Sequence, residues 1–230
     1  MFGLPKNRVS DGDRDDKAPV TEFPNKRGSL PSSKDWRNDK WPVKDQKSCG
    51  SCWTFSALGA IQGNCGLKKN TWYDLAEQEL VDCCTVKNGF FECSGCGGGW
   101  MSWAMQYVYL NHGATKTSLY PYIARDSGSC KEVHDTDRFC TPKQVYHFPA
   151  GSYDDLIYAL NQGPVAVGVN ASPWHFYDGT SVLGADQCSG PMSAVNHGVV
   201  AVGWGVTEQG VEYWLLRNSW GSRWGKSGHI

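Results

Sequence analysis

The spacing of apolar residues differs between the two halves of this 230-residue chain. Residues 52–61 contain no proline and carry apolar side chains near helical spacing, which predicts a helix that begins at Cys52. Asp74, with Glu77 three positions on, has the pattern of a capping box and predicts a second helix. Residues 100–110 predict a third. The first half is therefore predicted to be mainly helical.

In the second half, runs of β-branched and aromatic residues are bounded by turn residues. Ser152 is predicted to cap one more helix, which ends at Gly163 and Pro164. Strands are predicted over three runs: 165–169, 198–203 and 212–216. A helical region followed by a strand-rich region predicts an α+β fold of two lobes, and ligands favour the cleft between such lobes.

Ten cysteines are the most informative feature of the composition. So many thiols in a chain of this length indicate an oxidising compartment, either a lysosomal or vacuolar lumen or the outside of the cell. The 22 Lys and Arg nearly balance the 23 Asp and Glu, and no basic block indicates nucleic acid as a partner. No apolar run approaches the length that spans a bilayer, so no membrane partner is expected.

Candidate chemistry centres on residues 46–53, where small and polar residues give way to helix-forming sequence. A thiol at a helix start meets unpaired N–H groups and the positive end of the helix dipole, which lower its pKa and favour the thiolate. Cys52 is therefore the candidate nucleophile. Gln46 can turn its side-chain amide toward the space that the Cys52 N–H also faces, which supplies two donors for a developing oxyanion.

A thiolate nucleophile needs a base, and His197 stands out among the six histidines because it opens an apolar strand that would hold it rigidly. The next strand returns after a turn near residues 208–210, so the two can form an antiparallel hairpin. Opposed residues then have numbers that sum to about 417, which puts Asn218 beside His197. Asn218 would orient the imidazole, and Trp220 would shield their hydrogen bond from water. Four other histidines are interpreted as surface or capping residues: His112, His134, His147 and His175.

The stretch Cys49-Gly-Ser-Cys-Trp53 matches the local signature of papain and the cathepsins at every position. Asn196-His-Gly198 and Asn218-Ser-Trp-Gly221 also stand where motifs of that family stand, so the chain resembles the papain-like cysteine peptidases. In the family, His and Asn follow the nucleophile by about 130–150 residues. Here they follow by 145 and 166 residues, which requires a modest insertion.

The resemblance implies a papain-like fold with a helical lobe, a β-rich lobe and the active-site cleft between them. It also implies a cysteine endopeptidase that forms a thioester on Cys52, with no metal or cofactor. Peptide or protein substrates, protein inhibitors and the chain's own propeptide are the implied partners of a monomer. Two alternatives stay open: a catalytically silent homologue that only binds peptides or inhibitors, and acyl transfer to an amine instead of water.

By the same resemblance, an extended substrate lies against the glycine-rich loop at Gly98 and Gly99, because side chains there would block its approach. The pocket for the residue second from the cut on the acyl side is expected to be roomy and apolar. The residues implied in substrate binding, beyond the two glycines, are Trp100, Met101, Gly168, Gly198 and Trp220.

The resemblance also implies two disulfides, Cys49–Cys96 and Cys83–Cys130. Five cysteines have no assigned partner: Cys65, Cys84, Cys93, Cys140 and Cys188. A zinc site is the alternative for the cluster Cys83, Cys84, Cys93 and Cys96, since thiolates at such spacings bind zinc. Disulfides are favoured because paired thiols in an oxidising lumen normally become oxidised.

Three spans are expected along the chain. Residues 1–28, which precede a family-like Leu30-Pro stretch, are either the tail of an inhibitory propeptide or a flexible extension. Residues 29–145 form the mainly helical lobe that carries the nucleophile. Residues 146–230 form the β-rich lobe that carries the base, and we expect this lobe to lack its last strands, which would leave Cys188 without its family partner.

Overall fold

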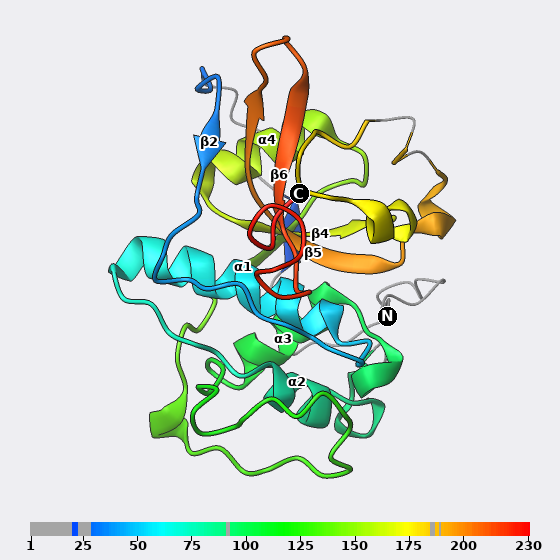
Figure 1. Cartoon of the computed structure of the whole chain (residues 1–230). Coiled ribbons are helices and arrows are strands. Elements are labelled where there is room, and N and C mark those ends of the chain that lie inside the picture. The colour runs from blue at the N-terminus through cyan, green and yellow to red at the C-terminus, as the bar shows by residue number, and fades with distance from the viewer. Residues whose placement is uncertain (1–19, 23–28, 91–92, 185–186, 189) are drawn as a thin grey trace.

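A computed structural model describes residues 20–22, 29–90, 93–184, 187–188 and 190–230. It has two lobes, one of helices and one built on an antiparallel sheet (Figure 1), as the α+β prediction requires. The regular elements are β1 Val20–Glu22, β2 Lys34–Asp35, α1 Cys52–Lys69, α2 Glu77–Cys83, α3 Met101–Leu110, β3 Val145–His147, α4 Tyr153–Gln162, β4 Val165–Val169, β5 His197–Val206 and β6 Glu212–Arg217. Short 3-10 turns are Val86–Asn88, Gly95–Gly97, Asp135–Asp137, Ser172–Phe176 and Met192–Ala194. The helical lobe comprises α1–α3 with their loops, and the β lobe comprises α4 with β2, β4, β5 and β6.

Helix α1 lies at the junction of the lobes, with α3 on one side and β5 on the other. Its first nine residues are all buried, because apolar surface meets them from both sides. A Cβ added at Gly59 would lie only 2.7 Å from Cγ2 of Val200 on β5. Glycine at this position therefore lets the sheet approach the helix closely enough to hold both lobes together.

The start of α2 differs from the prediction. Its N-cap is Ala76, with no side-chain cap, so the expected capping box is wrong. Both carboxylates of that pattern pair instead with Lys44, whose Nζ lies 2.6 Å from Asp74 and 2.8 Å from Glu77. Lys44, thirty residues before Asp74, thus pairs with the two carboxylates that a capping box would have used.

Strand β5 pairs antiparallel with β4 and with β6, and β2 pairs with β5 near residues 203–204. Val200 pairs with Arg217 and Ala201 with Leu216, which is the predicted hairpin register. The register shifts by one residue between Ala201 and Gly203, at a bulge. Helix α4 lies beside this sheet and begins as predicted, with the Ser152 side chain accepting a hydrogen bond from the Asp155 N–H.

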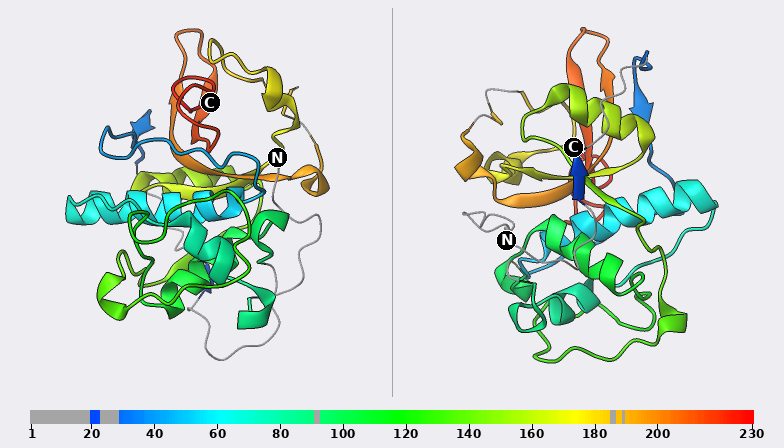
Figure 2. Two further views of the ribbon diagram at one scale, coloured as in Figure 1. Left: turned by 60° about the horizontal axis from the view of Figure 1, so that its bottom comes forward. Right: turned by 180° about the vertical axis from the view of Figure 1, so that it is seen from behind.

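Two segments before the first helix take part in pairing. Strand β2 falls in the span expected to form the helical lobe, yet it pairs with β5 of the β lobe. Strand β1 pairs in parallel with β3 and lies on the back of the molecule (Figure 2). Apart from residues 20–22, the predicted propeptide tail or extension at 1–28 lies outside the described residues.

The described residues contain four disulfides: Cys49–Cys96, Cys65–Cys140, Cys83–Cys130 and Cys84–Cys93. The first and third are the pairs that the family resemblance implied. All four cysteines of the alternative zinc cluster are oxidised in these bridges, so they offer no thiolate to a metal, and that alternative is wrong. Cys52 and Cys188 form no disulfide with the described residues.

Candidate active site

Cys52 is the first residue of α1 and is fully buried between the lobes. Ser51 is the N-cap, and its carbonyl accepts hydrogen bonds from the Thr54 and Phe55 N–H groups. The N–H of Cys52 itself belongs to the first turn, where the helix offers no acceptor. The thiol therefore occupies the end of a helix of 18 residues at which negative charge is stabilised.

His197 begins β5, and Asn218 directly follows β6 on the neighbouring strand. The imidazole Nε2 lies 2.8 Å from Asn218 Oδ1, and both residues are buried. The same Oδ1 accepts a hydrogen bond from the Ser219 N–H at 2.8 Å, which fixes the orientation of the amide. Burial lowers the pKa of His197 to about 4, and the hydrogen bond to Asn218 opposes that shift.

The start of β5 packs on the first turns of α1, which brings the elements that carry His197 and Cys52 into contact. A Cβ added at Gly198 would lie 3.4 Å from the Cys52 carbonyl oxygen and 3.3 Å from Ser56 Cβ. Ser56 Oγ donates to the Val199 carbonyl at 2.6 Å, which ties the helix to the strand directly. The structure thus brings the candidate nucleophile and the candidate base to one seam.

Trp220 lies against the imidazole, with its ring centroid 4.9 Å from that of His197. On the exposed side, His175 stacks on Trp220 at 6.0 Å with the ring planes 15° apart. Trp174 and Trp224 contact Trp220 edge-on. This aromatic cluster packs around the histidine of the pair. His175, interpreted from sequence as an ordinary surface residue, belongs to that cluster.

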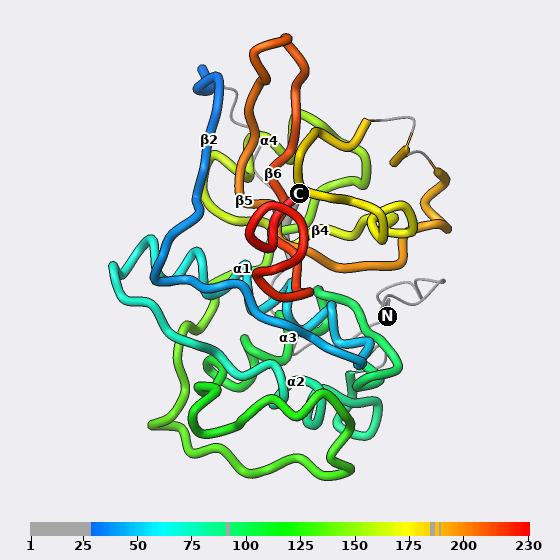
Figure 3. The backbone as a smooth tube through the Cα atoms, in the orientation of Figure 1, coloured from blue at the N-terminus to red at the C-terminus, as the bar shows by residue number. Residues whose placement is uncertain are grey.

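Gln46 comes from the segment that crosses from the β lobe toward α1 (Figure 3), and it is fully buried. Its side-chain Nε2 donates to the Cys49 carbonyl at 2.9 Å, and its Oε1 accepts from Ser219 Oγ at 2.7 Å. Its backbone N–H also donates to the Ser219 carbonyl at 2.8 Å. Ser219, the residue after Asn218, therefore forms hydrogen bonds with both the backbone and the side chain of Gln46.

The expected substrate-binding residues occupy two places. Gly98 and Gly99 are buried in a loop that is held near the start of α1. The Cys49–Cys96 disulfide joins this loop to the segment before α1, and the Trp53 indole on α1 donates to the Gly95 carbonyl. Trp100, Met101 and Gly168 line a large open hollow of about 1570 Å³ that extends between α1, α3, β3 and α4. Gly198 lies next to Met101, because a Cβ there would come within 3.2 Å of Met101 Sδ, but it lines the separate small cavity between the lobes.

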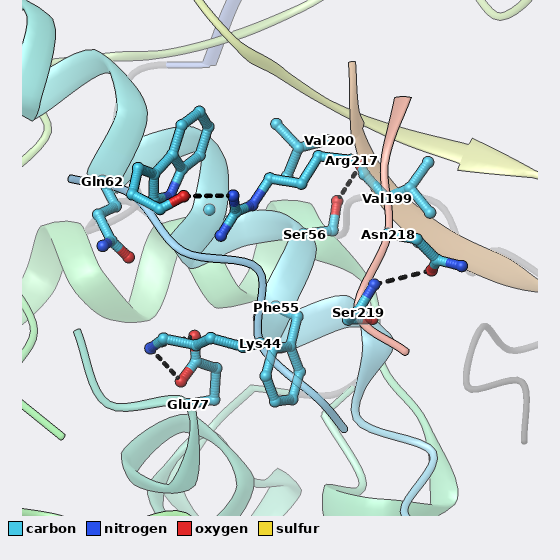
Figure 4. A pocket seen from close by; sticks show the side chains of 13 residues that line it. Lys44, Phe55, Ser56, Gln62, Glu77, Val199, Val200, Arg217, Asn218 and Ser219 are labelled. Atoms are coloured by element: carbon cyan, nitrogen blue, oxygen red, sulfur yellow. Dashed lines mark hydrogen bonds and ion pairs between the residues drawn. The ribbon is translucent and has the colours of Figure 1, made fainter. Parts of the chain in front are cut away.

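A small cavity of about 20 Å³, lined in part by Asn218 and Ser219, lies where the lobes meet (Figure 4). On one wall Lys44 Nζ donates to the buried carboxylate of Glu77, and burial raises the pKa of Glu77 against the opposing effect of Lys44. On the other, the Arg217 guanidinium lies 4.3 Å above the Trp41 ring and donates to the Trp41 carbonyl at 2.7 Å. These contacts anchor the residue that precedes Asn218.

Three residues that hold this site together were not predicted from the sequence: Ser51, Tyr122 and Ser219. Ser219 lies inside a family-like motif, so its position was a signal. The Tyr122 hydroxyl forms hydrogen bonds with the Gln46 carbonyl and with Ser51, both more than seventy residues away in the sequence. Nothing in local spacing pointed to it.

Within the described residues, no group of three or more His, Cys, Asp or Glu side chains is arranged to hold a metal ion. Nor is any helix of that part of the chain long and apolar enough to cross a membrane. The chemistry that these residues offer at the seam is that of a thiol at a helix start, an imidazole with an amide partner, and amide donors.

A two-lobed α+β fold with a cysteine and a histidine–asparagine pair at its seam is the architecture of a cysteine peptidase. A family model described as papain family cysteine protease matches residues 30–230. The chain belongs to the papain family of cysteine proteases.

Relatives by sequence include the probable cysteine protease RD21C of Arabidopsis thaliana, 42% identical over 204 residues, which are 88% of this chain and 43% of the relative. Digestive cysteine proteinase 3 of Homarus americanus is 38% identical over 92% of this chain and 64% of its own length. The chain thus spans less than two thirds of these two curated relatives.

Solved structures agree with the family assignment. Digestive procathepsin L 3 of the Tenebrio molitor larval midgut superposes with a TM-score of 0.81 at 37% identity, over 93% of this chain and 68% of that one. The bromelain protease of Ananas comosus, solved with the inhibitor E64, gives a TM-score of 0.71 at 32% identity, over 87% of this chain and 88% of that one.

Proposed function

We propose that this chain is a cysteine endopeptidase that hydrolyses peptide bonds through a thioester on Cys52. The observation that carries the proposal is the 2.8 Å hydrogen bond between His197 and Asn218 at a strand that packs on the start of α1. Asn218 leaves the other imidazole nitrogen to face the nucleophile.

The reaction begins with the Cys52 thiolate and the His197 imidazolium as a pair. Burial alone disfavours a charged imidazole, as the lowered pKa of His197 indicates, so the thiolate is the counter-ion that makes the charged form accessible. The sulfur attacks the carbonyl carbon, and the π electrons of the carbonyl move to oxygen. The Cys52 N–H and the Gln46 amide donate to that oxyanion.

Collapse of the tetrahedral intermediate breaks the carbon–nitrogen bond, and the imidazolium gives its proton to the leaving amine. His197, now neutral, takes a proton from water as the water attacks the thioester. The second tetrahedral intermediate collapses and its carbon–sulfur bond breaks, which releases the acid product and restores the thiolate and the imidazolium. Transfer of the acyl group to an amine would use the same residues as transfer to water. The ratio of the two reactions is therefore a quantity to be measured.

Binding of an extended peptide is assigned to Gly98 and Gly99, with its second acyl-side residue in the hollow beside Trp100, Met101, Gly168 and Gly198. Indole, thioether and glycine groups carry no charge, which favours an apolar side chain there. Trp220 borders the leaving-group side.

Four disulfides support an oxidising location for this function, a lysosomal or vacuolar lumen or the cell exterior. Protein inhibitors and the propeptide are the proposed partners of a monomer, since both would occupy the cleft that a peptide substrate uses.

The test is turnover of a dipeptidyl reporter by the purified chain, before and after treatment with a thiol-directed epoxide, with Cys52→Ala beside it. Both treatments are expected to abolish hydrolysis. Hydrolysis that survives Cys52→Ala would reject the proposal. A chain that binds peptides yet leaves the reporter intact would instead be the silent homologue.

A further inference from the structure

Tyr122 lies on the loop that follows α3 and reaches back to the start of α1. Its hydroxyl oxygen is 2.8 Å from the Gln46 carbonyl oxygen, to which it donates, and 2.6 Å from Ser51 Oγ. A tyrosine hydroxyl has one proton. Since that proton is donated to Gln46, the Ser51 hydroxyl must donate to Tyr122. The result is a directed chain, Ser51 to Tyr122 to Gln46.

The two ends of this chain are the supports of the two proposed oxyanion donors. Gln46 supplies the side-chain amide, and Ser51 is the N-cap whose next residue supplies the Cys52 N–H. In the loop between the two donors, Lys47 has a positive φ of 52° and Cys49 is bridged to Cys96. The Tyr122 hydroxyl adds a direct link between Gln46 and Ser51, the residues at the two ends of this loop.

The surroundings hold Tyr122 in one orientation. Its ring meets the ring of Phe55 edge-on at 5.1 Å, beside the first turn of α1. Burial raises the pKa of its hydroxyl to about 12, so the proton needed for the bond to Gln46 is retained at neutral pH and well above it.

We propose that Tyr122 is a positioning residue for the oxyanion hole: its hydroxyl fixes the separation between the Gln46 amide and the Cys52 N–H. Ser219 holds the side-chain oxygen of Gln46 from the β lobe, and Tyr122 holds its backbone carbonyl from the helical lobe. The Tyr122 hydroxyl acts on the reaction through its two partners, Gln46 and Ser51. The inference rests on the proposed function, because it concerns the donors of that reaction.

The matched pair of variants is Tyr122→Phe and Tyr120→Phe. Both remove one hydroxyl from the same loop, but the Tyr120 hydroxyl donates to Asp82 at 2.9 Å and has no contact with Gln46 or Ser51. Tyr122→Phe is expected to lower kcat roughly three- to tenfold with KM nearly unchanged, the effect of one hydrogen bond. Tyr120→Phe is expected to leave kcat unchanged.

Two further readouts separate positioning from a general loss of structure. Affinity for a peptide aldehyde, whose adduct oxygen uses the oxyanion donors, should fall by the same factor as kcat in Tyr122→Phe. The rate at which iodoacetamide alkylates Cys52, which needs the thiolate but no oxyanion donor, should stay unchanged. Ser51→Ala breaks the same chain at its other end and should give a loss that is not additive with Tyr122→Phe.

An unchanged kcat and aldehyde affinity in Tyr122→Phe would overturn the inference. So would an alkylation rate that falls in step with kcat, or an equal loss in Tyr120→Phe. Because aldehyde binding needs no turnover, the comparison holds even in a chain that hydrolyses nothing. A failure of the proposed function would appear as absent hydrolysis in the unsubstituted chain.

Discussion

In the helical lobe and the loops around it, four disulfides join positions between Cys49 and Cys140, whereas the described residues of the β lobe contain none. The β lobe is held by its strand ladder and by packed aromatic rings, with Trp174 stacked on Trp224 at 5.8 Å. The nucleophile therefore sits on a covalently braced frame, and the base on a frame of non-covalent contacts. The lobes should respond differently to reduction, acid and local mutation.

The largest effect is expected from the Cys65–Cys140 disulfide, which ties the C-terminal half of α1 to a residue 75 positions away. Replacing both cysteines by alanine should lower the free energy of unfolding by about 4 kcal/mol, because a long loop is released in the unfolded chain. The same change at Cys84 and Cys93, nine positions apart, should cost about 3 kcal/mol. Urea unfolding measures both. A long-loop variant as stable as the unsubstituted chain would contradict the importance of this brace.

Acid should act on the β lobe through His229, which is buried near the C-terminal end. Burial lowers the pKa of His229 to about 4, from an ordinary value of 6.5. Folding therefore favours its neutral form, and stability is full above pH 6.5 and lost as the pH falls toward 4. By about pH 5 the loss from this group is about 2 kcal/mol.

His229→Gln should flatten that part of the pH dependence, measured as unfolding free energy at about pH 7 and about pH 5. The exposed His134→Gln serves as the control, because it is on a loop of the other lobe. Equal pH slopes in the unsubstituted chain and in His229→Gln would show that this histidine is not the acid-sensitive group.

A smaller effect distinguishes the two helix starts. Ser152→Ala removes the side chain that caps α4 and should cost about 1 kcal/mol. Asp74→Ala should cost less than about 0.5 kcal/mol, because Asp74 caps nothing and its carboxylate is largely exposed where it pairs with Lys44. Thermal unfolding measures the loss of stability in each variant. A larger loss in Asp74→Ala than in Ser152→Ala would support a capping box at the start of α2.

Local signals along the chain predicted most of the helices, the strands and the Ser152 cap. The pairing of His197 with Asn218 could also be predicted, because a short turn between two apolar strands fixes the register. Features that depend on residues far apart could not. Lys44 displaced the expected cap at Asp74, and the partners of Cys65 and Cys84 became clear only once the loops were placed in space. Tyr122 acts on Gln46 across more than seventy residues, so no local pattern revealed it.

The central claim is that Cys52 is held as a thiolate by His197 across the seam. The direct measurement is the rate of iodoacetamide alkylation of Cys52 from about pH 5 to about pH 9, with Cys188→Ser in every sample so that the exposed thiol does not contribute. We predict a rate that stays high well below the ordinary thiol pKa of about 8.5, and that falls about tenfold per pH unit below that pKa once His197→Ala is introduced. The same tenfold fall in the chain that retains His197 would contradict the claim.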